Sequence, residues 1–200
     1  MKTSTPQECL NKSREDDVVT EVLKSVNLKS VVFCRSELRA PWGFSIAEQE
    51  WAGFHIVTRG KCWIRFGGDE DPVALREGDL AILTRGDEHV LADKPGTPTT
   101  SFDSSLMREM MDESRTYRIG GSGAVTELIC GGFFFNEQKL NPLLSALPRL
   151  IHNKGGRRQA APWLRMTMEY IAEELKANQP GNYALATGLI GFQTFFSFRR

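Results

Sequence analysis

The sequence predicts a mainly β domain, an antiparallel barrel or sandwich, followed by a helical C-terminal segment. Between residues 30 and 135 the chain consists of short runs rich in Val, Ile, Phe and Trp, separated by Gly, Pro and Asp. Short strands at such regular spacing are typical of barrels and sandwiches. After residue 135 the apolar residues recur at helical spacing. The 200 residues suffice for one core with a helical appendage, whereas two full domains would be cramped.

Composition limits the classes of function. The charges of the 25 basic and 25 acidic side chains cancel, so the chain as a whole has no net positive charge that would attract nucleic acid or an anionic membrane. Residues 1–17 lack the apolar region of a signal peptide, and no run reaches the roughly 18 apolar residues that a membrane-spanning helix needs. We therefore expect a soluble, cytoplasmic protein without membrane contacts.

The four cysteines, Cys9, Cys34, Cys62 and Cys130, show no CxxC or Cys/His spacing. This pattern fits neither a structural zinc site nor a secreted disulfide scaffold. We expect reduced and mostly buried thiols, and we expect no cofactor.

The elements are predicted in the following order. Residues 1–15 are expected to form a disordered tail, and residues 16–27 a short amphipathic helix with an acidic first turn. Strands are expected in the runs "SVVFCRSEL", "WGFSIAE", "AGFHIVTRG", "KCWIRFGG", "PVALREGD", "LAILTRG", "EHVLAD" and "AVTELICGGFFF". Residues 93–122 are polar and rich in Pro, Gly and Ser, and we interpret them as a mobile linker or, alternatively, as a functional lid.

Helices are predicted over residues 136–200, in "NPLLSALPRLIH", "PWLRMTMEYIAEELKA" and "NYALATGLIGFQTFFSF". Pro162 is tolerated in a first helical turn, and "QPGN" supplies a turn before the last helix. We interpret the apolar positions of these helices as core or as a dimerisation element. The dimer-interface candidates are Leu164, Met168, Ile171, Leu175, Leu189 and Phe192.

The stretch "REGDLAILTRGDEHVL", residues 76–91, carries the first functional signal. Its Gly78, Gly86 and His89 have the spacing of the second cupin motif, which this stretch resembles, whereas Thr84 and Asp93 replace the usual Pro and Asn. We expect Gly86 to permit a tight hairpin turn, and the strand period of two then directs His89 to the interior. His89 is interpreted as a cavity residue, a residual metal ligand or a structural histidine that caps the turn.

The first cupin motif, His-x-His followed by Glu seven residues before a glycine, is not kept. Counting back from Gly60, the glutamate position is Gly53, and the preceding region reads "SIAEQEW". His55 lies two residues beyond Gly53, so we expect it on the same inward face and in one cavity with His89. Two histidines without a carboxylate make a poor site for a catalytic metal, even with Cys62 as a weak third candidate. We expect no metal and assign no catalytic residue.

Many further blocks resemble the N-terminal sensing domain of one branch of bacterial AraC/XylS-type transcriptional regulators, over about residues 16–180. The blocks are residues 32–38, 40–43, 54–55, 60, 62–63, 78–79, 85–86, 89, 130–131, 141–144, 147–148 and 163–165. The resemblance implies an RmlC-like jelly-roll cupin barrel over residues 16–135 that senses a small molecule, with dimerisation through the C-terminal helices.

In such regulators a separate domain with two helix-turn-helix units reads DNA. The chain ends at Arg200, near where that domain would begin, so we expect no DNA-binding domain within these residues. A truncated gene product, a frameshifted tail and an expressed fragment remain open as explanations.

These observations lead to one hypothesis and two alternatives. We hypothesise the non-catalytic, ligand-sensing and dimerisation domain of an AraC-type transcription regulator, a homodimer whose effector the fold does not specify. The alternatives are a metal-dependent cupin enzyme, a dioxygenase or isomerase that uses His55 and His89, and a truncated regulator that only sequesters partner subunits. The pocket candidates are His55, His89, Trp42, Trp63 and Cys62, although barrel packing is the favoured role of the two tryptophans.

Overall fold

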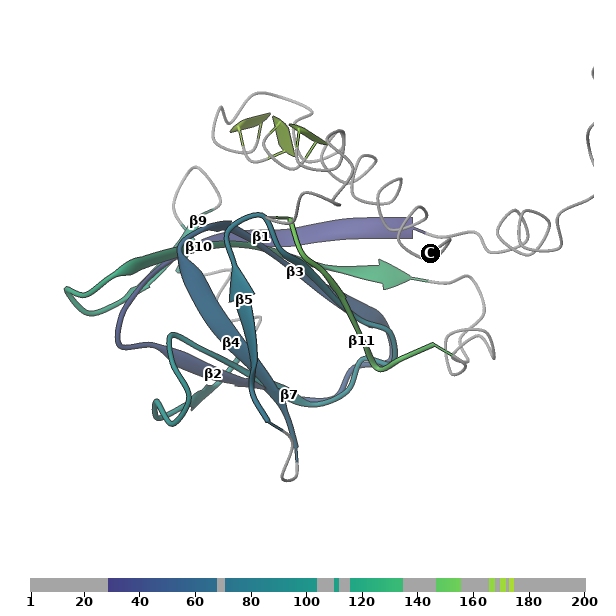
Figure 1. Ribbon diagram of the computed structural model, residues 1–200, viewed down its shortest axis with the longest axis horizontal. Helices are drawn as coiled ribbons and strands as arrows, with labels where there is room; N and C mark the ends of the chain where they lie inside the picture. Colours follow the sequence, from purple (N-terminus) through teal and green to yellow (C-terminus); the bar gives the residue numbers. More distant parts are fainter. Residues whose placement is uncertain are drawn as a thin grey trace, which may run out of the picture.

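The computed structural model describes residues 29–67, 71–103, 110–111, 116–134, 147–155, 166–167, 170–171 and 173–174. Within these residues, eleven strands form two sheets that face each other (Figure 1). Their bounds are β1 Lys29–Arg39, β2 Gly43–Ile46, β3 Ala52–Arg59, β4 Lys61–Phe66, β5 Val73–Arg76, β6 Leu80–Leu83, β7 His89–Ala92, β8 Thr100–Ser101, β9 Thr116–Gly120, β10 Val125–Phe134 and β11 Leu150–Asn153. The predicted mainly β fold is confirmed. The predicted tail and the helix over residues 16–27 lie outside the described residues.

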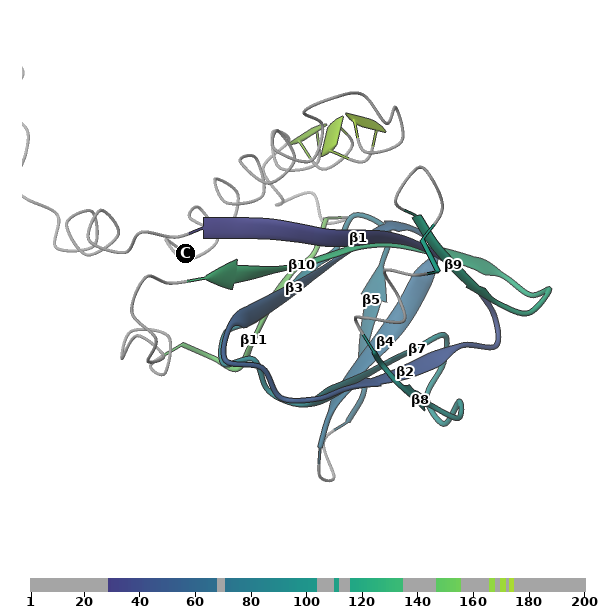
Figure 2. The ribbon, with the colours of Figure 1, turned by 180° about the vertical axis from the view of Figure 1, so that it is seen from behind.

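The two sheets differ in size. The larger sheet has the strand order β11-β6-β3-β10-β1-β9, and the smaller sheet has the order β5-β4-β7-β2-β8. Among the described strands, neighbours run antiparallel except at two edges, where β9 is parallel to β1 and β8 is parallel to β2. Figure 2 shows β1, β10 and β3 of the larger sheet above β2, β7 and β4 of the smaller sheet. The space between these layers is the interior of the barrel.

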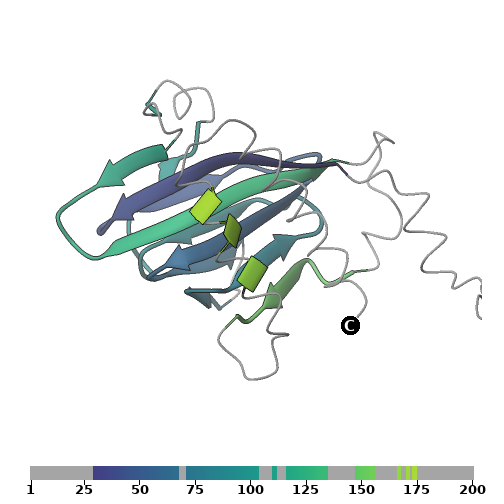
Figure 3. The same ribbon diagram turned by 90° about the horizontal axis from the view of Figure 1, so that it is seen from above.

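The larger sheet buries apolar residues on both of its faces. Leu38, Val57 and Leu128 point inward and pack against residues of the smaller sheet such as Ile64. The cluster on the outer face comprises Val32, Ala52, Phe54, Ile56, Leu80, Ile82, Ile129, Phe133 and Ile171. Ile171 belongs to the described helical residues, which lie across the outer face of this sheet (Figure 3). Because both faces are covered, β6 is buried throughout instead of alternating between buried and exposed positions.

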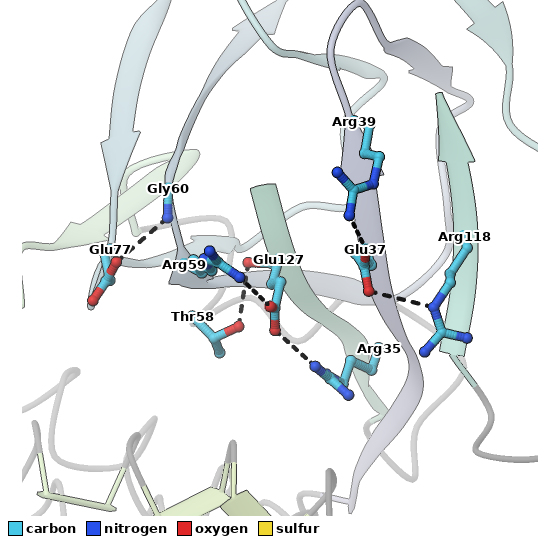
Figure 4. A network of polar contacts seen from close by, with 9 residues as sticks. All are labelled: Arg35, Glu37, Arg39, Thr58, Arg59, Gly60, Glu77, Arg118 and Glu127. Carbon is cyan, nitrogen blue, oxygen red and sulfur yellow. Dashed lines mark hydrogen bonds and ion pairs between the residues drawn. The ribbon is translucent and has the colours of Figure 1, made fainter. Parts of the chain in front are cut away.

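One end of this outer face is charged (Figure 4). Glu127 of β10 is buried and accepts a hydrogen bond from Arg35 of β1 at 2.7 Å, and Arg59 of β3 lies 3.6 Å from its carboxylate. Glu37 of β1 accepts a hydrogen bond from Arg118 of β9 at 3.3 Å. These ion pairs join four neighbouring strands and fasten the parallel edge strand β9 to β1.

The expected hairpin over residues 76–91 is wrong. Strand β6 pairs with β3 and β11 in the larger sheet, whereas β7 pairs with β2 and β4 in the smaller sheet. The turn between them therefore carries the chain from one sheet to the other. Gly86 permits this turn, since its φ of 67° is positive and a Cβ atom there would collide with the carbonyl oxygens of Gln49 and Trp51. Strands β4 and β5 do form a hairpin.

The segment "NPLLSALPRLIH" was predicted to be helical, but its C-terminal end forms a strand. Its last residues belong to β11, which pairs antiparallel with β6 from Leu150 opposite Leu83 to Asn153 opposite Leu80. The edge of β6 supplies the backbone partners for this strand. Tertiary pairing therefore outweighs the local helical spacing of the apolar residues.

The interpretation of residues 93–122 as a mobile linker is wrong for β8 and β9, because each extends an edge of a sheet. The alternative of a functional lid stays a prediction. The described residues beyond 155 are helical, as predicted for "PWLRMTMEYIAEELKA". Among the described residues no helix is both long and apolar enough to span a bilayer. The domain boundaries at residues 15 and 135 stay a prediction.

Candidate ligand-binding site

A cavity of about 580 Å³ lies between the two sheets. A volume of this size is typical of small-molecule sites, which are mostly apolar with a few polar groups. Its apolar lining includes Phe33, Leu38, Phe44, Trp51, Leu91, Phe102, Leu128 and Phe134. Its polar lining comprises Cys34, Ser36, Gln49, His55, His89, Tyr117 and Cys130. Among the described residues that line the cavity, none is Asp, Glu, Lys or Arg.

Aromatic rings pack against one another in the cavity wall. The ring centroid of Trp51 lies 4.9 Å from that of Phe33 and 5.6 Å from that of Phe134. Phe44 meets Phe102 edge to face, with centroids 5.9 Å apart. Rings held by other rings have few alternative positions, so this wall is a preformed apolar surface.

Two histidines from opposite sheets meet in the cavity wall. His55 lies on the central strand β3 and His89 is the first residue of β7, and the Nε2 atoms of the two rings are 3.0 Å apart. Both residues are buried, with exposed fractions of 6% and 5%. Strand alternation places His55 on the inner face together with Val57, because the intervening Ile56 belongs to the outer cluster.

The hydrogen-bond partners determine which ring nitrogen carries each proton. His89 Nδ1 lies 2.8 Å from the carbonyl oxygen of Asp87, which can only accept, so this nitrogen carries a proton and donates it. In neutral His89 the Nε2 atom is then the acceptor, and His55 Nε2–H donates to it. His55 Nδ1 is left as an acceptor for the Cys130 thiol, whose sulfur lies 3.2 Å away. The three contacts form one directed chain of hydrogen bonds.

Both histidines are neutral at pH 7. Burial lowers the pKa of His55 well below its ordinary value, and the neighbouring His89 lowers it further. Burial also lowers the pKa of His89, and the Asp87 backbone carbonyl and carboxylate only partly oppose this. The cavity therefore presents a polar but uncharged pair of rings in a mostly apolar wall.

This arrangement does not fit a metal centre. The two Nε2 atoms hydrogen-bond to each other, and the Cys130 sulfur contacts the opposite nitrogen of His55. Cys62 is fully buried and does not line the cavity, and burial together with Asp79 raises its pKa to about 12. Within the described parts of the chain, no three His, Cys, Asp or Glu side chains are grouped so that they could hold a metal ion. Gly53, at the position of the carboxylate ligand, lines the cavity without a side chain.

The remaining pocket candidates lie elsewhere. Trp42 is buried in the inner cluster and does not line the cavity. Trp63 points away from the interior, since the buried residues of β4 are Cys62, Ile64 and Phe66, which alternate with it along the strand. The Lys61 ammonium lies 5.4 Å from the centre of the Trp63 ring. The described interface candidate Ile171 is fully buried within this chain. The five other interface candidates, Leu164, Met168, Leu175, Leu189 and Phe192, lie outside the described residues.

Sequence reasoning missed Cys34, Ser36 and Cys130 as cavity residues. Cys34 and Ser36 alternate with outward-facing residues of β1, and this alternation was readable as a strand signal. The position of Cys130 opposite both Cys34 and His55 follows from the pairing of β10 with β1 and β3. That pairing joins segments far apart in the sequence, so local patterns carried no sign of it.

A family model described as Cupin matches residues 17–192. The chain belongs to the cupin family. The predicted cupin fold is thereby confirmed, and the two facing sheets are the barrel of this cupin domain.

The cupin domain is similar to transcription regulators. An AraC-like transcription regulator of Streptomyces lividans is 27% identical over 136 residues, which cover 68% of this chain and 43% of the relative. The HTH-type transcriptional regulator AlkR of Acinetobacter baylyi is 22% identical over 169 residues, which cover 82% of this chain and 54% of the relative. The crystal structure of ToxT from Vibrio cholerae aligns with 88% of this chain and 54% of that chain, at 10% identity and a TM-score of 0.41. The predicted resemblance to AraC-type regulators is confirmed, and the chain spans about half the length of the curated relatives it matches.

Proposed function

We propose that this cupin domain is the ligand-sensing part of an AraC-type transcription regulator and is not an enzyme. The observation that carries the proposal is the cavity of about 580 Å³, apolar over most of its wall and preformed between two sheets. The similarity of the chain to AraC-like regulators supports a regulatory role for what binds there.

The wall chemistry supports an uncharged and mostly apolar effector. A charged molecule would lose its hydration without meeting an opposite charge among the described lining residues. The His55–His89 pair can give one hydrogen bond to a ligand if the contact between the two rings opens. An effector with one carbonyl or hydroxyl group on an apolar body satisfies both requirements.

We further propose that the complete regulator consists of two domains with different functions. The cupin domain binds the effector and forms a homodimer through its C-terminal helices, and a separate helix-turn-helix domain binds DNA. Two findings support this proposal. The relatives are named as transcription regulators, and the matched segments cover only about half of their length.

Gly53 offers a test of the cavity as the binding site. It lies on β3 and lines the cavity, and a Cβ atom added there would contact only Leu83, at 3.9 Å. We expect the full chain to bind the neutral, apolar dye Nile red, and Gly53→Leu to fill the cavity and weaken binding at least about tenfold. Fluorescence titration measures the dissociation constants.

Gly67→Leu is the matched control, because position 67 is exposed and has no atom within 4 Å of an added Cβ. It should bind the dye as the wild type does. Equal affinity of Gly53→Leu and the wild type, at equal thermal stability, contradicts the cavity as the binding site.

A further inference from the structure

Cys34 and Cys130 stand directly opposite each other on two neighbouring strands. They are partners in the antiparallel register of β1 and β10, and both line the cavity. Residues opposite each other in an antiparallel pair have Cα atoms about 4.5 to 5.5 Å apart. Disulfides bridge Cα atoms about 4.4 to 6.8 Å apart. The backbone therefore already holds the two cysteines at a separation that a disulfide can span.

Both thiols are free, and both side chains line the cavity. Cys34, Cys62 and Cys130 are free cysteines, and the Ser36 hydroxyl lies 3.5 Å from the Cys34 sulfur. The neighbouring Cys130 and Ser36 side chains lower the pKa of Cys34, whereas the neighbouring Cys34 and burial raise the pKa of Cys130. Cys34, whose thiolate the Ser36 hydroxyl can stabilise, is the nucleophile of the pair, and Cys130, whose S–H donates to His55 Nδ1, is the second thiol.

We propose that Cys34 and Cys130 form an oxidation site for uncharged hydroperoxides that enter the cavity, and that they close a cross-strand disulfide in its wall. The reactant is hydrogen peroxide or an organic hydroperoxide with an apolar body, because the described lining is mostly apolar and includes no Asp, Glu, Lys or Arg. The site does not depend on the cavity also binding an effector.

The chemistry balances in two steps. The Cys34 thiolate attacks the peroxide, a sulfur–oxygen bond forms and the oxygen–oxygen bond breaks, and the leaving alkoxide or hydroxide takes up the proton released by Cys34. The Cys130 sulfur then attacks the oxidised Cys34 sulfur and expels hydroxide, which takes up the Cys130 proton as water. His55 Nδ1, 3.2 Å from the Cys130 sulfur, is placed to pass on this proton. Two thiols are oxidised to one disulfide, and one hydroperoxide is reduced to an alcohol or to water, with one further water released.

Oxidation changes the polar wall of the cavity. The disulfide removes the S–H group that donates to His55 Nδ1, so the first donor of the hydrogen-bond chain through His55 and His89 is lost. Cys62 provides an internal comparison, since it is fully buried away from the cavity with a pKa of about 12. It should remain a thiol under the same treatment.

The experiment treats the full, reduced chain with hydrogen peroxide and, in parallel, with cumene hydroperoxide, followed by alkylation and peptide mass mapping. We expect a loss of about two thiols and about two mass units per chain, a single peptide pair linked through Cys34 and Cys130, and full reversal by dithiothreitol. Cys62→Ala should behave as the wild type, and Cys34→Ser and Cys130→Ser should form no linked peptide. Cys9→Ser is run alongside, because position 9 lies outside the described residues.

Mapping of the wild type decides the outcome even if a cysteine variant folds poorly. The proposal is overturned if Cys34 and Cys130 remain thiols at a hydroperoxide dose that oxidises half of the free glutathione in the same tube. It is also overturned if the products are sulfinic acids or a disulfide that involves Cys62.

Discussion

Two histidine contacts in this cupin domain, one partly buried and one buried, give the same side chain different roles. His152 of β11 donates to the Asp79 carboxylate at 2.8 Å, and Asp79 also accepts the backbone N–H groups of Arg76 and Gly155, at 3.0 Å each. Burial would raise the pKa of Asp79, but the hydrogen bonds and the charge of His152 together lower it. The carboxylate thereby fastens the corner between β5 and β6 to β11.

The other contact lacks a carboxylate. His55 and His89 pair with each other, and burial keeps both rings neutral. The first arrangement holds strands together, whereas the second leaves an uncharged polar group facing a cavity. The partner of each histidine therefore determines whether it stabilises strand packing or faces the cavity. The substitutions below test this difference.

The largest effect is expected at Asp79. Replacement by Ala leaves two backbone N–H groups and His152 without their acceptor, so Asp79→Ala should lower the free energy of unfolding by about 3 kcal/mol. Asp87→Ala is the matched control, since its ion pair with Arg149 is partly exposed and is worth at most about 1 kcal/mol. Urea denaturation measures both values. Equal losses in the two variants would mean that Asp79 does not fasten the corner.

A smaller effect on stability is expected when either histidine is replaced, and the two losses compare the two contacts directly. His152→Phe removes a donor from a buried carboxylate and should cost about 2 kcal/mol. His89→Phe removes two hydrogen bonds between uncharged groups, one from His55 and one to the partly exposed Asp87 carbonyl, and should cost about 1 kcal/mol. Both variants keep a ring of similar size at the position. The unfolding midpoints rank the two. A larger loss for His89→Phe would show that the cavity pair is the main structural contact.

The smallest effect is expected from pH. The folded-state pKa of His55 lies well below 6.5, so below pH 6.5 the unfolded chain binds a proton that the folded chain does not. Stability therefore falls as the pH drops below 6.5, because His55 must release this proton when the chain folds. Asp79 acts in a lower window, because its lowered pKa contributes stability that is lost only as the pH falls below about 4.

His55→Gln isolates the contribution of His55. The variant should lose less stability than the wild type between pH 7.5 and pH 5.5, because glutamine binds no proton in the unfolded chain. Urea titrations at both pH values supply the comparison. Parallel pH profiles for the two proteins are the result that refutes a neutral, buried His55.

Much of the barrel was predictable because strand alternation and glycine turns are local signals. The inward face of β3 was reached by counting two residues from Gly53 to His55, and the run "KCWIRF" alternates as β4 does. The turn at Gly86 was also visible, since only its positive φ permits the corner.

The partners of the strands were not predictable by the same means. Local pattern is alike for a turn within a sheet and a turn between sheets, so β6 and β7 were expected to pair with each other. Strand β11 was not predicted for a related reason. Its apolar residues have helical spacing, and its pairing with the edge of β6 is a long-range contact that local spacing does not show. The Cys34–Cys130 and His55–Cys130 contacts depend on the same long-range register.

The register of β3 places the cavity and the helical residues on either side of a single strand. His55 faces the cavity, and its immediate neighbours Phe54 and Ile56 belong to the cluster that holds Ile171. One peptide unit therefore separates a residue that a ligand can touch from residues that support the helical segment. The inner face of β3 lines the cavity, and its outer face belongs to the cluster that contains Ile171. The two environments are separated only by the thickness of one strand.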